Sequence, residues 1–229
     1  SRGLDHVPFS LSKRISCIFF SLPADMTEQD LIKPPDSSKR ICVYCASSTQ
    51  SDAEYRDAAY ESGQLLAKEG FEIIYGGGAL GSMGALADGA LEAGGRVIGV
   101  LPEFMQELEW GHSSLSELKI VASLHERKME MIEKADGIIA LPGGSGTFEE
   151  LLEALTWKRL ALFTNPIVLL NTRNYYDAFQ QMMQQAVDER FMHQQHLQMW
   201  SLVDKPLDLV PALRNAPNWD PQKVGLAVQ

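Results

Sequence analysis

Residues 142–150, Pro-Gly-Gly-Ser-Gly-Thr-Phe-Glu-Glu, have the composition of an anion-binding loop. Gly143, Gly144 and Gly146 lack Cβ atoms, so the backbone N–H groups around them can closely approach a ligand. An apolar helix pattern follows, and a helix N-terminus carries unpaired donors and a partial positive charge. These features predict a phosphate site. No Lys-Ser/Thr pair follows the glycines, which disfavours a Walker-type loop and ATP hydrolysis.

Two acids come just after these glycines, and Glu150 has two interpretations. Thr147 and Glu150 show the T-x-x-E spacing of a capping box, in which the glutamate bonds the backbone N–H of the threonine and does no chemistry. Alternatively, the carboxylate is functional. It would repel a bound phosphate, but it becomes useful where positive charge develops during a reaction. These residues alone leave both interpretations open.

A second cluster of candidate residues opens the stretch "LHERKMEMIEKA" (124–135). His125, Arg127 and Lys128 stand at the start of a predicted helix, where the helix dipole disfavours cations. This unfavourable placement suggests a task for Arg127 or Lys128. The alternative is a solvated charged face, and His125 alone fits a structural or solvent-facing role better.

Two further turns carry small residues, "CASST" (45–49) and "YGGGALGSMG" (75–84). Gly76, Gly78 and Gly81 match the G-x-G-x-x-G spacing of dinucleotide-binding turns. The acid expected about 20 residues later is missing, since Arg96 stands there. The turn therefore predicts either proximity to a phosphate or close packing of helix on strand, and it disfavours NAD.

The elements that position these turns alternate along the chain from Arg40 onward. β-branched apolar runs predict strands, amphipathic stretches predict helices, and their alternation predicts parallel βαβ units with helices on both faces. We therefore expect an α/β fold, a Rossmann-like three-layer sandwich with a mostly parallel central sheet. Ligands bind such sheets beyond the carboxyl ends of the strands, where the strand order reverses. The predicted strands are 41–47, 71–76, 96–102, 118–123, 137–142 and 166–171, and the predicted helices are 52–69, 82–93, 124–135, 147–162 and 175–189.

Composition excludes several classes of partner. The 229 residues carry a formal net charge of -10, which argues against nucleic acid and anionic membrane surfaces. No apolar run reaches the roughly 20 residues of a membrane helix. Cys42 and Cys45 lie three apart in a strand pattern and should point to opposite faces, as buried cysteines rather than a redox or metal pair.

The two ends of the chain are expected to lie outside the core. Residues 1–39 form a predicted N-terminal extension, 40–215 the domain and 216–229 a C-terminal tail. The segment 13–25 combines a basic pair with a short apolar run, so a targeting segment is an alternative. Met26 begins a polar stretch and is a candidate initiator.

Four motifs together resemble the Lonely Guy (LOG) family. "PGGSGTFEE" matches its P-G-G-x-G-T-x-x-E motif, "YGGGALGSMG" matches Y-G-G-G-x-x-G-x-M-G, "CASS" resembles C-G-S-S with Ala46 for Gly, and "LHERK" resembles M-H-x-R-K with Leu124 for Met. The resemblance runs from about Arg40 to about Leu213. Family members are phosphoribohydrolases of cytokinin nucleotides that are often mislabelled lysine decarboxylases. That label does not fit, because lysine decarboxylation needs pyridoxal phosphate held on a lysine and the motifs offer no such site.

The resemblance implies hydrolysis of the N-glycosidic bond of a nucleoside 5′-monophosphate, without metal or cofactor. It makes Arg127 and Glu150 the catalytic pair, and "PEFMQELEW" (102–110), which departs from the plant pattern, the place to look for base selectivity. Two alternatives are a broader nucleotide nucleosidase and a non-catalytic nucleotide-binding module like the related molybdenum-cofactor carriers. The implied substrate-binding residues are Ser47, Gly78, Glu109, Arg127, Lys128, Gly143, Gly144, Ser145, Gly146, Thr147, Glu150 and Thr156.

The resemblance also implies a cytoplasmic homodimer or a larger even-numbered assembly. Helices 129–135 and 151–163 carry more large apolar groups than one sheet face needs. Met131, Trp157 and Leu160 are therefore candidate contact residues, and burial against the sheet is their alternative use.

Overall fold

Seven parallel strands form the central sheet, in the order β4-β3-β2-β1-β5-β6-β7. The structure is a computed structural model that describes residues 39–106, 111–217 and 219–223. The predicted N-terminal extension, apart from Lys39, lies outside the described residues. The strands are β1 (Arg40–Tyr44), β2 (Glu72–Tyr75), β3 (Val97–Pro102), β4 (Glu117–Val121), β5 (Gly137–Ala140), β6 (Ile167–Leu170) and β7 (Ser201–Val203).

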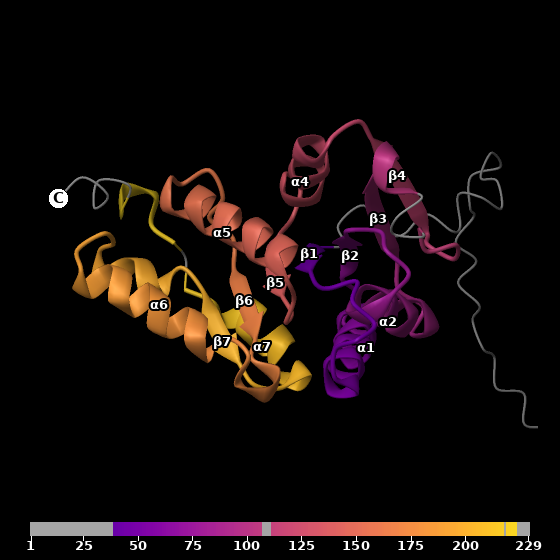
Figure 1. Cartoon of the computed structure of the whole chain (residues 1–229), viewed down its shortest axis with the longest axis horizontal. Helices are drawn as coiled ribbons and strands as arrows, with labels where there is room; N and C mark the ends of the chain where they lie inside the picture. Colours follow the sequence, from indigo (N-terminus) through magenta and orange to yellow (C-terminus); the bar gives the residue numbers. More distant parts are fainter. Residues whose placement is uncertain (1–38, 107–110, 218, 224–229) are drawn as a thin grey trace, which may run out of the picture. The chain divides into compact units, whose positions relative to one another are not determined.

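Helices cover both faces of the sheet, so the predicted three-layer α/β fold is confirmed. Helices α1 (Ala53–Lys68), α2 (Gly81–Glu92) and α7 (Leu209–Asn215) pack into one apolar core cluster. Helices α4 (Leu124–Ile132), α5 (Ser145–Arg159) and α6 (Asp177–Asp188) pack into the other. Figure 1 shows α4 and α5 on one side of the strands and α1 and α2 on the opposite side. Apart from Glu72 at the start of β2, the inner strands β2, β5 and β6 read as apolar runs because both of their faces are buried.

The sequence pattern predicted most of these elements and missed two. Strand β7 has three residues, and α7 carries Pro211 in its first turn, so neither shows a periodic pattern long enough to recognise. Within the predicted C-terminal tail, Trp219 is 4% exposed and packs into a core cluster. No helix among the described residues is long and apolar enough to span a membrane.

Cys42 and Cys45 are buried free thiols that pack into the two different core clusters. This confirms the prediction that they point to opposite faces of the sheet.

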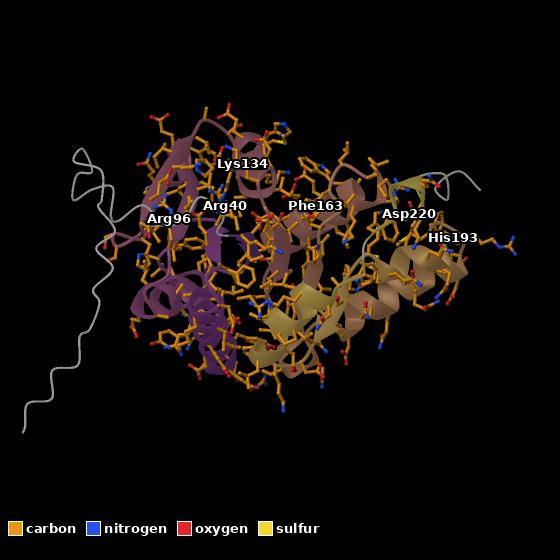
Figure 2. All side chains as sticks on the ribbon, turned by 180° about the vertical axis from the view of Figure 1, so that it is seen from behind. Arg40, Arg96, Lys134, Phe163, His193 and Asp220 are labelled. Carbon is orange, nitrogen blue, oxygen red and sulfur yellow. The ribbon has the colours of Figure 1, made fainter. Side chains whose placement is uncertain are left out.

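A chain of ion pairs joins neighbouring strands at the amino end of the sheet. The carboxylate of Glu72 accepts from the Nε atoms of Arg40 at 2.5 Å and Arg96 at 2.6 Å, and Arg96 also pairs with Glu117. Arg40 and Arg96 are labelled near each other in Figure 2. Arg96, the residue found where a dinucleotide site needs an acid, therefore serves strand pairing at the end of the sheet opposite the glycine-rich turn.

Lys158 of α5 is an ionisable group that is almost fully buried. It is 3% exposed, and its Nζ donates to the backbone oxygen of Asn165 at 2.6 Å. Burial lowers the pKa of this ammonium from 10.5 to about 8. Its charge therefore destabilises the folded state at neutral pH.

Replacing Lys158 by Met should raise the free energy of unfolding at pH 7 by about 1–3 kcal/mol, because the buried charge is removed. Between pH 8 and 10.5, Lys158 of the parent keeps its proton in the unfolded state and has lost it in the folded state. The free energy of unfolding of the parent therefore rises with pH through that window. The advantage of Lys158→Met should accordingly shrink above pH 8. Chemical denaturation at pH 7 and pH 9.5 checks this, and an advantage independent of pH would contradict it.

Candidate active site

The strand order reverses between β1 and β5, and a cleft opens beyond their carboxyl ends. Strands β2 to β4 extend from β1 on one side, and β6 and β7 extend from β5 on the other. The cleft has a volume of 910 Å³. The turns 45–49, 75–84 and 141–147 each contribute residues to this cleft. The lining residues are Cys45, Ala46, Ser47, Ser48, Met83, Met105, Leu124, His125, Arg127, Lys128, Gly144, Ser145, Gly146, Thr147, Glu149 and Glu150.

The N-terminus of α5 points its first residues into this cleft. Its N-cap is Gly144, and no side chain caps the helix. The N–H of Phe148 donates to the Gly144 oxygen at 3.1 Å, so the N–H groups of the three residues before it precede the helical hydrogen-bond ladder. With the helix dipole behind them, these donors suit an anion.

The capping-box interpretation of Glu150 is wrong. The helix begins at Ser145, two residues earlier than predicted, so Thr147 is an interior first-turn residue and not the N-cap. Thr147 is 4% exposed, and its side chain packs against Gly143. Glu150 lies one turn further along α5 and lines the cleft.

The three glycines of the loop have different reasons to be glycine. A Cβ on Gly143 would lie 2.1 Å from Thr147 Oγ1, so this position is small for internal packing. A Cβ on Gly144 or Gly146 would meet nothing within 4 Å, and neither residue has a positive φ. Since Gly144 and Gly146 line the cleft, their missing side chains leave space for a ligand rather than for the protein.

Arg127 enters the site from the first turn of α4, which Ser123 begins by accepting the Glu126 N–H at its Oγ. Arg127 is 5% exposed, and its guanidinium donates from Nε to the Val100 oxygen at 3.1 Å and from Nη2 to the Gly76 oxygen at 2.8 Å. A Cβ on Gly76 would lie 2.2 Å from Nη2. Position 76 is therefore a glycine because a side chain there would clash with Arg127. For this residue of the "YGGGALGSMG" turn, the close-packing alternative holds.

The other glycines of that turn also serve packing. Gly81 has φ 61°, and a Cβ there would come within 2.5 Å of the backbone of the "CASST" turn. The same contact brings Ser47 and Ser48 to the cleft wall. A Cβ on Gly84 would lie 2.1 Å from the Ala79 oxygen.

Two buried groups close to Arg127 and Glu150, the Cys42 thiol and the Tyr44 hydroxyl, are neutral. Burial, followed by the Glu150 carboxylate, raises the pKa of the Cys42 thiol well above its usual value. Burial also raises the pKa of the Tyr44 hydroxyl, with further contributions from Cys42 and Glu150. Both groups stay protonated at neutral pH, so neither adds a charge beside Arg127 and Glu150.

Lys128 lines the cleft and ties its two helical walls together. Its Nζ lies 2.5 Å from Glu149 and 3.0 Å from Glu153, both on α5. These ion pairs hold α4 against α5 across the mouth of the cleft.

Three of the predicted substrate-binding residues that the structure describes do not line the cleft. Gly78 forms an antiparallel bridge with Gly111, and its backbone oxygen accepts a hydrogen bond from the Tyr75 hydroxyl. Gly143 packs against the Thr147 side chain. Thr156 is exposed on α5 and donates to the Leu152 oxygen. Glu109 lies outside the described residues.

The cleft also has an apolar wall, and part of it comes from residues 102–110, the stretch in which base selectivity was expected. Met83, Met105 and Leu124 line it, and the Met105 sulfur lies 3.8 Å from Nη1 of Arg127. Met83 stood within a recognised motif, but isolated apolar residues carry no pattern that separates a pocket wall from the core. No group of three metal-ligating side chains occurs within residues 39–106, 111–217 and 219–223.

Known proteins resemble this chain in sequence and fold. A family model described as "Possible lysine decarboxylase" matches residues 83–213. Cytokinin riboside 5′-monophosphate phosphoribohydrolase LOG1 of Arabidopsis thaliana is 38% identical over 199 residues, spanning 82% of this chain and 93% of that protein. Cytokinin riboside 5′-monophosphate phosphoribohydrolase LOG of Oryza sativa subsp. japonica is 44% identical over 154 residues, spanning 67% of this chain and 64% of that protein.

Solved structures share the fold. TM1055, a structural genomics target, superposes with a TM-score of 0.60 at 25% identity, covering 77% of this chain and 98% of that one. A molybdenum cofactor carrier protein from Chlamydomonas reinhardtii superposes with a TM-score of 0.59 at 21% identity, covering 79% and 98%. The second likeness shows the fold alone.

The fold and the cleft define a Rossmann-like α/β protein with an uncapped helix N-terminus at its topological switch point. With the sequence matches, this places the chain in its family: it belongs to the Lonely Guy (LOG) family.

The two kinds of loop glycine make a matched pair of variants. Gly144→Val should lower the affinity for ribose 5-phosphate at least tenfold and the free energy of unfolding by no more than about 1 kcal/mol, because its side chain enters the cleft. Gly143→Ala should instead lower the free energy of unfolding by about 1–3 kcal/mol through the clash with Thr147. Calorimetric titration and chemical denaturation separate the two effects. Unchanged affinity in Gly144→Val would remove the loop from the ligand site.

Proposed function

We propose that this protein hydrolyses the N-glycosidic bond of cytokinin riboside 5′-monophosphates and releases the free base and ribose 5-phosphate. One observation carries the proposal: a single cleft brings together an uncapped helix N-terminus, the Arg127 guanidinium and the Glu150 carboxylate. The names of the relatives in Arabidopsis and rice support the same activity.

In this proposal the 5′-phosphate lies at the start of α5. The N–H groups of Gly144, Ser145, Gly146 and Thr147 supply the donors, and the Ser145 and Thr147 hydroxyls and Ser47 are further candidate ligands. From Ser145 to Glu150 the helix rises roughly 7.5 Å. A ribose can span this separation, so a phosphate at the helix start puts the glycosidic carbon near the carboxylate.

The proposed chemistry follows from the charge that develops on the sugar. As the bond from C1′ to the base nitrogen breaks, its electron pair leaves with the base and the ribose becomes oxocarbenium-like. The Glu150 carboxylate stabilises this positive charge and takes a proton from the water whose hydroxyl bonds to C1′. The base nitrogen takes up a proton from solvent as it leaves, and Glu150 returns its proton to solvent, so one water is consumed per bond broken. The Arg127 guanidinium orients the nucleotide and the carboxylate through charge-assisted hydrogen bonds.

The apolar wall supports a base with an apolar substituent. The side chains of Met83, Met105 and Leu124 offer apolar contact area, which suits the apolar chain of a prenylated adenine. We also propose a cytoplasmic location, which the buried thiol of Cys42 suits.

We further propose a homodimer or a larger even-numbered assembly that uses the outer face of α5. Leu152 and Leu160 are 39% and 41% exposed, and Leu162, just beyond the helix, is 69% exposed. Thr156 lies between the first two, so in such a dimer it would face the partner rather than its own cleft. Met131 was also expected at the contact, but it is 1% exposed and packs in the core. Burial against the sheet, the alternative considered for it, therefore holds.

Glu150→Gln should lower the rate of base release by roughly 10²–10⁴-fold and leave AMP binding largely intact, because the amide can neither take a proton nor stabilise a cation. Free base should be quantified with isopentenyladenosine monophosphate and with AMP as substrates. Glu61→Gln, an exposed α1 variant, is the control. A folded Glu150→Gln protein with near-normal turnover would contradict the assignment. A large preference for AMP would favour the broader nucleosidase, and binding without base release in the parent would favour a non-catalytic module.

Leu160→Glu should shift the assembly toward monomer and lower activity per chain, because it places a charge on the proposed contact. Leu207→Glu, equally polar but in the short helix Pro206–Asp208, should leave both unchanged. Light scattering over a concentration series, run beside turnover assays, decides the question. A parent protein that is monomeric and fully active would overturn the assembly.

A further inference from the structure

The loop before α5 is held by two consecutive tyrosines from a distant part of the chain. The Tyr176 hydroxyl donates to the Leu141 oxygen at 2.8 Å, and the Tyr175 hydroxyl donates to the Gly143 oxygen. Both residues come from the segment between β6 and α6. Neither belongs to the motifs that resemble the LOG family, and neither lines the cleft.

The bond from Tyr175 fixes the orientation of one peptide group. A trans peptide is planar, so its C=O and N–H point in opposite directions, and the described chain contains no cis peptide. When the Gly143 oxygen points at Tyr175, the N–H of Gly144 must point away from it. Gly144 is the N-cap of α5 and lines the cleft, so this N–H is the first donor of the anion site.

The Tyr175 ring is locked in place by other aromatic rings. It stacks on Phe148 with centroids 6.1 Å apart, and it makes edge contacts with Tyr55 at 5.9 Å and Tyr176 at 5.3 Å. Phe148 belongs to α5 itself, directly after Thr147. A hydroxyl on a ring held this way loses little freedom when it bonds the loop, so the loop is preorganised.

The two residues before Tyr175 have an unusual backbone conformation. Arg173 and Asn174 have φ of 57° and 58°, in the left-handed region that non-glycine residues rarely occupy. Ion pairs from Arg173 to Asp52 at 3.2 Å and Glu54 at 3.1 Å hold this turn against the start of α1, which follows the "CASST" turn. The Asn171 side chain accepts the Tyr176 N–H at 2.7 Å.

We propose that Tyr175 is a positioning residue for the 5′-phosphate site: its hydroxyl holds the Gly143–Gly144 peptide with the Gly144 N–H turned toward the phosphate. This inference rests on the proposed function, since it assumes that the start of α5 receives the phosphate. Tyr175 touches no substrate and acts only through the loop. Burial raises the pKa of its hydroxyl, so the group is protonated and able to donate at neutral pH.

The test is Tyr175→Phe, which keeps the ring contacts and removes only the hydroxyl. Tyr60→Phe is the matched control, because it removes a hydroxyl that bonds Glu92 on an exposed surface of α1. Titration calorimetry with ribose 5-phosphate should show about 3- to 10-fold weaker binding for Tyr175→Phe, the worth of one neutral hydrogen bond. KM for the nucleotide should rise by the same factor, with kcat nearly unchanged and the melting temperature within a few degrees of the parent.

The outcomes separate the inference from the function beneath it. If the parent does not bind ribose 5-phosphate, the phosphate site itself is wrong and the inference falls with it. If the parent binds it and Tyr175→Phe binds equally well, only the positioning role is overturned. A fall in kcat without a rise in KM, or an equal loss of affinity in Tyr60→Phe, would also overturn it, because either would indicate a general structural effect.

Discussion

The candidate site depends on a guanidinium buried at the carboxyl ends of the strands. Removing a cation from water is costly, and Arg127 is compensated by backbone oxygens of Val100 and Gly76, on two neighbouring stretches of the sheet. The same bonds fasten the first turn of α4 over the sheet, and Lys128 then joins α4 to α5. The cleft therefore has fixed walls, and the lack of a side chain at Gly76 leaves room for the Arg127 guanidinium.

This arrangement separates two electrostatic requirements that conflict at short range. A phosphate needs donors and positive potential, whereas a sugar that becomes cationic needs a nearby carboxylate. Helix α5 meets both, because its N-terminus offers backbone donors and Glu150 stands further along the same helix. The neutral Cys42 and Tyr44 beneath add no competing charge. A fold of this kind does not by itself define the chemistry, so the proposed activity rests on the charged pair in the cleft.

Local patterns predicted the parts of this protein that local rules govern. Apolar runs and turn glycines placed β1 to β6 and the switch-point edge, and the loop glycines marked the start of α5 to within two residues. Roles that depend on contacts between distant segments could not be predicted this way. Gly76 looked like a phosphate-binding glycine and instead admits an arginine 51 positions away. Tyr175 carried no signal, because its proposed role arises only where the β6–α6 segment meets the loop. The capping-box spacing could not be judged from the sequence, because it depends on where the helix begins.

The central claim is that the phosphate lies at the start of α5 and the glycosidic bond lies beside Arg127 and Glu150. A crystal structure of the Glu150→Gln protein with AMP bound tests this most directly. The account predicts phosphate oxygens within hydrogen-bond distance of the N–H groups of residues 144–147, and C1′ of the ribose next to the side chain at position 150. A nucleotide bound with its phosphate elsewhere, or with its sugar turned away from position 150, would contradict it.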